Sequence, residues 1–489
     1  MQKPTSQILF FLLLATIGCH SGSSAKPDAL SNSGTNDSPS DTDSDGNLTP
    51  IVDNTNTSGN SSSGKAVADY FFVGSMSEDS SSDLLFWKKF GADPKTTRQI
   101  PARYIYINGG FVGSGWRSWS NVDGGRAINY IHNSFDMGMV PFFVYYQIPG
   151  AGGESNFIDL AHVQDVNFVF DYFRDFKFFL DIVRREGNGK EVGIILEPDF
   201  LGYMMQQTRH PADQIFAGVS GAYASGVLGP GDPRFPDTVQ GLVQAMNYAI
   251  QKFAPNAIFG WQMNLWASPG IGYRVPSNGL CRITDTMGVA AGREAVRFEA
   301  RQIALYYKNA GVLSHGAKSI FLDKYGLDGA AIFCADSARH PKDCIWFWNS
   351  DHWNNYVAFV DSVHKELQTP VILWQIPMGH LNNSDEPGAP LPNTDRKYED
   401  SGAAFIFGDT FNPTTPERSD YFGRVSDYKT TRNGTAITIH SHISDLVSAG
   451  AVGVLFGAGV GQATRFDTDN GWWISKTNQY YKNGVVPLR

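Results

Sequence analysis

The sequence is poor in the residue types that mark several large classes of protein. Its 489 residues include only four cysteines, which excludes a disulfide-rich scaffold. The formal net charge is -9 and no run of basic residues occurs, so we expect no nucleic-acid partner. HExxH, GxSxG and clustered-histidine patterns are missing, and with them the usual marks of metalloproteases, serine esterases and metal centres. We therefore expect neither a cofactor nor a metal.

The start of the chain has the features of an export signal. Lys3 precedes an apolar run over residues 8–16 that is too short to span a bilayer. The run ends in Ala15-Thr16-Ile17-Gly18-Cys19, which resembles the bacterial lipobox, where small residues precede a cysteine that becomes acylated. Residues 1–19 are thus expected to be a lipoprotein signal peptide, and Cys19 to anchor an exported protein to a bilayer of the bacterial cell envelope, on its periplasmic or cell-surface side. An ordinary signal peptide is the alternative.

Residues 20–66 consist mainly of Ser, Asn, Asp, Thr and Gly. Such a segment cannot bury enough apolar surface to offset the entropy lost on ordering, so it predicts a disordered tether. Residues 67–489 have a globular composition and are expected to form one domain.

Short apolar runs alternate with amphipathic helical stretches over residues 67–489. The eight predicted strands are Arg103–Asn108, Pro141–Gln147, Val192–Leu196, Ile258–Asn264, Leu327–Cys334, Val371–Gln375, Ala404–Gly408 and Val452–Phe456. Parallel strands buried on both faces require runs of this kind, so the pattern predicts an α/β fold, a (β/α)8 barrel of the TIM type. An open doubly wound sheet is the alternative, but Asn108–Gly113 matches its glycine-rich phosphate turn poorly.

The active site of such a barrel lies at the carboxyl ends of the strands. Carboxylates, amides and aromatic residues gather at these predicted ends, namely Asn108, Tyr145, Tyr146, Gln147, Glu154, Glu197, Asp199, Gln262, Asn264, Trp266, Asp336, Trp374, Gln375, His380, Asp409, Gln462 and Arg465. Carboxylates exchange protons with glycosidic oxygen and water, amides bind sugar hydroxyls, and aromatic faces stack on sugar rings. The combination favours an enzyme that hydrolyses glycosidic bonds.

Three segments, 141–154 (PFFVYYQIPGAGGE), 192–205 (VGIILEPDFLGYMM) and 242–266, resemble the family 6 glycoside hydrolases, which are inverting cellulases and cellobiohydrolases built on a barrel. In that family the Asp of the Glu-Pro-Asp motif is the general acid, and it falls on Asp199. The family's supporting Asp is replaced here by a glycine-rich loop in which only Glu154 could substitute, and its Asp-Ala-Gly-His reads Asn264-Leu265-Trp266-Ala267. The resemblance implies inverting hydrolysis of a polysaccharide, such as a β-glucan.

The site hypothesis assigns roles as follows. Asp199 is the general acid, and burial beside Glu197 is expected to raise the pKa of one of the two carboxyls. A second carboxylate, Asp336 or Asp409, activates water. The expected sugar contacts are Tyr146, Gln147, Glu154, Asn264, Trp266, Trp374 and Gln375. The alternative is that Glu197 and Asp199 are structural, and either pair with an arginine or cap the helix expected over Phe200–Gln207.

Cys334 and Cys344 are close enough in sequence to close a small disulfide loop, with free buried thiols as the alternative. Two other functions compete with hydrolysis: non-catalytic glycan binding at the cell surface, and a polysaccharide lyase on the same barrel. In each case we expect a monomer whose partners are a polysaccharide and the lipid bilayer.

Overall fold

The computed structural model describes residues 67–90, 100–111, 113–150, 155–269, 279–325, 348–378, 401–413, 416–457 and 465–488. The predicted signal peptide, Cys19, the tether and the Cys334–Cys344 pair lie outside the described residues. Among the residues that are described, no helix is both long enough and apolar enough to cross a membrane.

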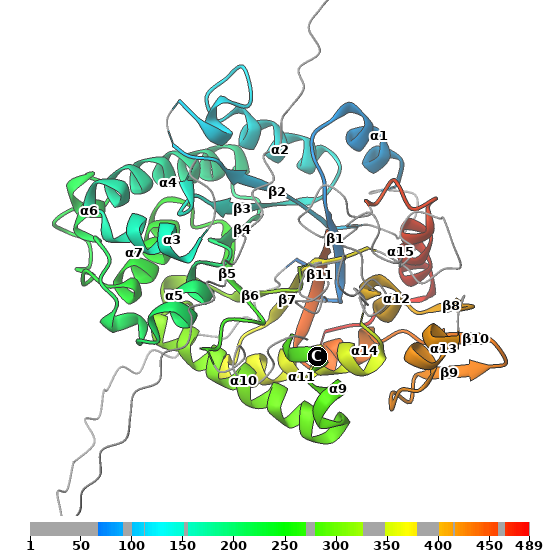
Figure 1. The fold of residues 1–489 in the computed structure, drawn as a ribbon. Coiled ribbons are helices and arrows are strands. Elements are labelled where there is room, and N and C mark those ends of the chain that lie inside the picture. The colour runs from blue at the N-terminus through cyan, green and yellow to red at the C-terminus, as the bar shows by residue number, and fades with distance from the viewer. Residues whose placement is uncertain are drawn as a thin grey trace, which may run out of the picture. The chain divides into compact units, whose positions relative to one another are not determined.

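Eight parallel strands close into a barrel, which confirms the predicted fold class (Figure 1). Around the barrel the strands follow the order β1, β11, β7, β6, β5, β4, β3, β2, and β2 returns to β1. Their bounds are β1 (Phe72–Met76), β2 (Ala102–Asn108), β3 (Val140–Tyr146), β4 (Val192–Leu196), β5 (Ala257–Met263), β6 (Ser319–Asp323), β7 (Val371–Ile376) and β11 (Ala451–Phe456). All eight carboxyl ends therefore meet at one face.

Helices surround the strands (Figure 1). They are α1 (Ser81–Phe90), α2 (Gly125–Asp136), α3 (Asn156–Gln164), α4 (Val166–Gly187), α5 (Phe200–Thr208), α6 (Ser220–Ala224), α7 (Val239–Phe253), α9 (Thr284–Met287), α10 (Val289–Ala310), α11 (Ser350–Leu367), α12 (Gly402–Phe407), α13 (Pro416–Gly423), α14 (Ile443–Ser448) and α15 (Trp472–Asn483). Local sequence fixes the ends of the long ones. In α4, the Asp165 carboxylate accepts from the Asn167 N–H at 2.8 Å, and Asn188 ends the helix in the left-handed conformation.

Alternate side chains of the strands fill the barrel, because successive residues of a strand point to opposite faces. The inward cluster is fully packed and strongly aromatic, and consists of Phe72, Ala102, Tyr104, Phe142, Val144, Tyr146, Ile195, Phe321, Ile372, Trp374 and Leu455. Two glycines make room for its rings. A β-carbon on Gly193 would lie 2.0 Å from the Phe142 ring, and one on Gly453 would lie 2.2 Å from the Phe72 ring.

Two of the predicted strands do not match any described strand of the barrel. Ala404–Gly408 is not a strand, since α12 covers Gly402–Phe407. All but the last residue of α12 are buried, so it is apolar all round, and a short run of that kind has no periodicity to separate helix from strand. Leu327–Cys334 lies outside the described residues. The barrel is completed instead by β1 and β6, which the sequence interpretation missed. In β1, Gly74 and Ser75 interrupt the run of apolar residues that would have indicated a strand.

A three-stranded antiparallel sheet is inserted between β7 and β11. It contains β8 (Asp409–Phe411), β10 (Ala436–Ile439) and β9 (Thr430–Asn433), in that order, and lies beside α13 at the lower right of Figure 1.

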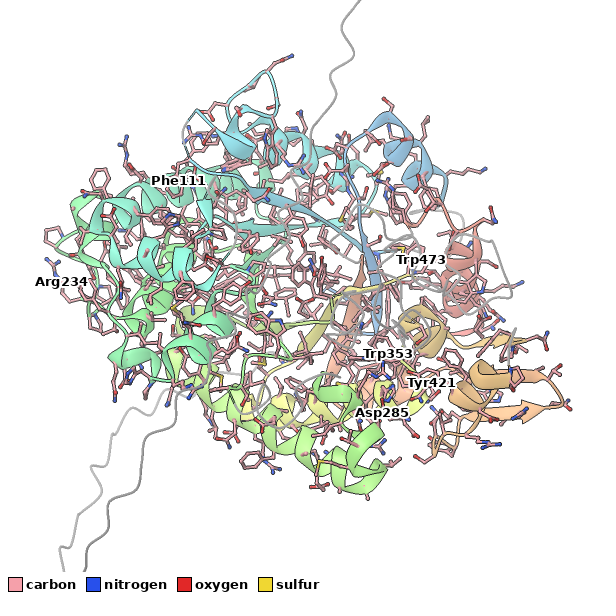
Figure 2. All side chains as sticks on the ribbon, in the orientation of Figure 1. Phe111, Arg234, Asp285, Trp353, Tyr421 and Trp473 are labelled. Carbon is pink, nitrogen blue, oxygen red and sulfur yellow. The ribbon has the colours of Figure 1, made fainter. Side chains whose placement is uncertain are left out.

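Buried histidines attach this inserted segment to the helices of the barrel. His352 in α11 lies with its Nε2 2.6 Å from Asp285 and packs near the Tyr421 ring, as Figure 2 shows for the labelled Asp285 and Tyr421. His442 stacks on Phe405 with ring centroids 3.7 Å apart, and its Nε2 is 3.2 Å from Asp427. The inserted sheet is therefore anchored by polar contacts as well as by apolar packing.

Candidate active site

Three of the candidate site residues have a left-handed backbone. The φ angle is 37° at Glu197, 67° at Asp199 and 54° at Gln375, all at the carboxyl ends of β4 and β7. A non-glycine residue in this region costs free energy, and such strain clusters at functional sites. In contrast, Asn188, Arg209 and Gln368 also have positive φ but are ordinary helix C-caps.

Two amides of β5 and its exit hold Asp199. The Asp199 N–H donates to Gln262 Oε1 at 3.0 Å, and Asn264 Nδ2 donates to Asp199 Oδ1 at 2.6 Å. Asp199 is half-buried and precedes α5, but its side chain makes no capping hydrogen bond to that helix. The capping role considered for Asp199 is therefore wrong, and its carboxylate is directed to the neighbouring strand end instead.

Asp323, the last residue of β6, is the carboxylate that the sequence interpretation missed. It is 4% exposed, and Gln262 Nε2 donates to its Oδ2 at 3.1 Å. One amide side chain therefore contacts both acidic residues: its oxygen binds the backbone of Asp199 and its nitrogen binds the side chain of Asp323. The available sequence signal was the short run Ser319–Asp323, which ends in an acid, much as Glu197 directly follows β4.

Glu197 points away from this pair and toward α4. Its carboxyl group accepts from the Gln147 N–H at 3.1 Å, the Ile148 N–H at 3.0 Å and the Tyr172 hydroxyl at 2.6 Å. Burial raises the pKa of Glu197 to about 8, and the three hydrogen bonds only partly oppose this. The cause is desolvation rather than the neighbouring carboxylate. Glu197 thus ties the exit of β3 to that of β4.

Aromatic rings lie inside and beside the barrel mouth. Trp374 packs against Tyr104 and Tyr106, with ring centroids 6.1 and 6.2 Å apart, and Gln375 Nε2 donates to the Tyr106 hydroxyl. Tyr146 is also in the inward cluster and is 7% exposed.

A second aromatic pair follows the ends of β4 and β5. The half-buried Trp266 packs at a tilt against Tyr203 of α5, with ring centroids 5.1 Å apart. A β-carbon on Gly202 would come within 3.1 Å of Trp266 and 2.4 Å of Asn264 Oδ1. The absence of a side chain at Gly202 therefore lets α5 approach Trp266 and Asn264, the second of which holds Asp199.

Several predicted site residues are elsewhere. Asp409, expected at the end of a barrel strand, begins β8 of the inserted sheet, because the segment before it is helical; it lies 3.8 Å from Lys476 of α15. The side chain of Gln147 is fully buried and accepts from the Gly110 N–H at 3.0 Å. Arg465 is paired with Asp83. Glu154, Asp336, His380 and Gln462 lie outside the described residues.

No set of three or more His, Cys, Asp and Glu side chains among the described residues could hold a metal ion. Cys281 is a buried free thiol. Asp175 accepts from Tyr145 and Trp116, and burial raises its pKa to about 6 despite these bonds and the nearby Arg117.

No protein-family model matches the sequence, and no curated protein matches it significantly. Among solved structures, the endo-1,4-β-D-mannanase of Thermotoga petrophila is 12% identical with a TM-score of 0.39, over 85% of this chain and 100% of that one. The β-mannanase of the blue mussel Mytilus edulis is 11% identical with a TM-score of 0.37, over 86% and 94%. The endoglucanase Cel6 of Mycobacterium tuberculosis is 12% identical with a TM-score of 0.30, over 66% and 78%. These three neighbours are glycoside hydrolases.

Proposed function

We propose that this protein is a glycoside hydrolase in which Asp199 is the general acid. The observation that carries the proposal is the position of Asp199: it is half-buried at a strained strand end, with its carboxylate held by Asn264 and its backbone held by Gln262. A proton donor must be held in a fixed position against the leaving oxygen, and these contacts supply that rigidity.

Asp323 is the second carboxylate of this proposal, in place of Asp336 and Asp409. In a single displacement, protonated Asp199 donates to the glycosidic oxygen while ionised Asp323 takes a proton from the attacking water. Inverting enzymes place the two carboxyls roughly 6.5–9.5 Å apart to leave room for that water. The Gln262 side chain contacts the Asp199 backbone and the Asp323 carboxylate. Its position between the two residues supports a gap between their carboxyl groups.

The proposed substrate is a polysaccharide, such as a β-linked glucan. The half-buried rings of Trp266 and Tyr203, which follow the ends of β5 and β4, offer flat faces to sugar rings. The predicted sugar contacts Trp374 and Asn264 are 0% exposed, so neither is proposed as a direct contact. We also propose that the protein is exported and held at the cell envelope by acylated Cys19, with residues 20–66 as the tether. Such an arrangement would bring the barrel to insoluble or surface-bound glycan.

The test is a panel of soluble polysaccharides with detection of the product anomer. We expect one β-linked glucan to be cleaved with inversion. Asp199→Asn and Asp323→Asn should each lower kcat by about 100-fold or more, because general acid–base catalysis contributes 10²–10⁴. Asp213→Asn, which changes an exposed acid on the same chain, is the matched control.

Each outcome separates the alternatives. Near-parental activity of Asp199→Asn on a substrate that the parent cleaves would exclude Asp199 as the acid. Products with an unsaturated end would identify a lyase. Glycan binding that survives in both variants, without hydrolysis by the parent, would identify a non-catalytic glycan-binding protein.

A further inference from the structure

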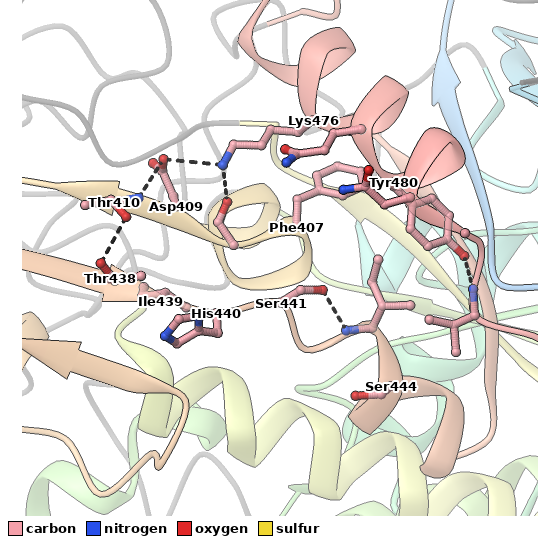
Figure 3. Close-up of a pocket in the computed structure, with 16 residues that line it drawn as sticks. Phe407, Asp409, Thr410, Thr438, Ile439, His440, Ser441, Ser444, Lys476 and Tyr480 are labelled. Carbon is pink, nitrogen blue, oxygen red and sulfur yellow. Dashed lines mark hydrogen bonds and ion pairs between the residues drawn. The ribbon is translucent and has the colours of Figure 1, made fainter.

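A pocket of about 500 Å³ lies on the flank of the barrel, away from the residues that contact Asp199. It is formed where the end of α12 and strands β8 and β10 face α14 and α15 (Figure 3). Its volume is within the range of roughly 300–1,000 Å³ that is typical of small-molecule sites.

The apolar walls of the pocket are fixed to the barrel. Phe407 stacks on Phe456, the last residue of β11, with ring centroids 5.7 Å apart. Tyr480 donates to the Phe71 carbonyl at 2.8 Å and accepts from the Val486 N–H at 3.1 Å, contacts that tie it to the start of β1. Both rings are thus held in place before any ligand arrives, which lowers the entropy lost on binding.

Two side chains of opposite charge, Lys476 and Asp409, line the pocket together with His440. Lys476 lies 3.8 Å from the Asp409 carboxylate and donates to the Gly408 carbonyl at 2.6 Å, as Figure 3 shows. Burial raises the pKa of Tyr480 to about 12, so its phenol is neutral at pH 7. An ionic ligand would have to break the Lys476–Asp409 pair or enter unmatched, and a neutral ligand meets no such cost.

Groups that both donate and accept hydrogen bonds surround the opening. Thr410 and Thr438 place their hydroxyls 2.9 Å apart on one side. On the other side α15 presents the exposed amides of Gln479 and Asn483, and neither has a hydrogen-bond partner in the described part of the chain. Hydroxyl and amide groups of this kind match the hydroxyls of a sugar, which also donate and accept.

We infer that this flank pocket is a second, non-catalytic binding site for a neutral mono- or disaccharide. The aromatic walls take the apolar face of a sugar ring, and the threonine hydroxyls and the two α15 amides take its hydroxyls. Neither Gln262 nor Asn264, the residues that hold Asp199, lines the pocket, so binding there does not rest on the proposed catalytic function.

The experiment is a titration of the full chain with glucose, mannose and cellobiose, followed by saturation-transfer NMR, with glucuronate as the charged analogue. The test variant is Gln479→Ala with Asn483→Ala. The matched control is Gln251→Ala with Gln302→Ala, which removes two exposed glutamines from α7 and α10. We expect at least one neutral sugar to bind and the test variant to weaken that binding about tenfold.

The control variant should bind as the parent does, and Asp199→Asn should keep the flank binding. The variant with Gln479→Ala and Asn483→Ala should cleave a short soluble substrate at the barrel mouth as fast as the parent does. Equal affinity of test and control variants, tighter binding of glucuronate than of glucose, or no binding of any neutral sugar would each overturn the inference.

Discussion

Replacing Glu197 with glutamine tests whether burial keeps the carboxyl group at the end of β4 uncharged at neutral pH. Glu197 is 1% exposed, and its side chain receives two backbone N–H groups and the Tyr172 hydroxyl. Glutamine has the same shape as the protonated acid. Its oxygen can accept the two N–H groups, and its NH₂ can donate to the Tyr172 oxygen.

The sign of the pH dependence follows from the raised pKa. The pKa of Glu197 is 4.5 in the unfolded chain and about 8 in the folded protein, so between these values the folded protein holds a proton that the unfolded chain has lost. The free energy of unfolding therefore falls as the pH rises through this window. At 1.36 kcal/mol per pKa unit, the loss between about pH 6.5 and pH 8 is about 1.6 kcal/mol.

The assay is urea unfolding of the parent and of Glu197→Gln at several pH values between about 6.5 and 8. We expect the parent to lose stability across this range and the variant to be nearly flat, and at least as stable as the parent at pH 8. Glu294→Gln, at a side chain that is 74% exposed, is the control and should keep the parental slope. A parent whose stability is constant or rises with pH, or a variant with the parental slope, would refute the reasoning.

Two further substitutions test the site and the inserted sheet. Gly202→Ala would place a β-carbon 2.4 Å from Asn264 Oδ1, so we expect Asn264 to be pushed off Asp199, with kcat at least about tenfold lower and stability reduced by about 1–3 kcal/mol. For Asp427→Asn, burial acts to raise the pKa of Asp427, but hydrogen bonds, that from His442 foremost, outweigh it and lower the pKa to about 2. A carboxyl group whose pKa is lowered on folding stabilises the folded protein at pH values above its pKa in the unfolded chain, and this stabilisation is lost as the pH falls toward 2. The variant should therefore be destabilised at pH 7 by roughly 1–2 kcal/mol, measured by thermal unfolding.

Each substitution has a control. Gly231→Ala adds a β-carbon where nothing lies within 4 Å, and it should leave both activity and stability unchanged. Asp420→Asn changes a more exposed acid near the same inserted sheet, and we expect a smaller effect. Parental activity of Gly202→Ala, or equal stability losses for the two aspartate variants, would show that the contacts assigned here do not matter.

The sequence by itself determined the barrel and the position of Asp199 at a strand end. Val192–Leu196 is a strand in both the interpretation and the structure, with the same bounds, because an uninterrupted apolar run closed by Glu-Pro-Asp leaves few alternatives. Proline also prevents β4 from continuing, so the acid that follows must lie at its carboxyl end.

Tertiary structure alone decided which acid shares the Gln262 side chain with Asp199. The apolar runs at 319–323 and 404–408 are of similar length, and their sequences do not reveal that the first is β6 and the second is α12. Asp323 therefore lies at a barrel strand end and contacts Gln262, whereas Asp409 begins β8 of the inserted sheet. Which segment closes a barrel depends on contacts between segments far apart in the chain, and a local sequence pattern does not reveal those contacts.

The orientation of Glu197 was also beyond the sequence. Alternation along β4 would point it into the barrel with Ile195, but a φ angle of 37° turns its carboxyl toward Tyr172. That turn separates the buried neutral acid from Asp199, although only Pro198 lies between them. The sequence determined which groups are present at the strand ends, and the backbone conformation decided which of them meet.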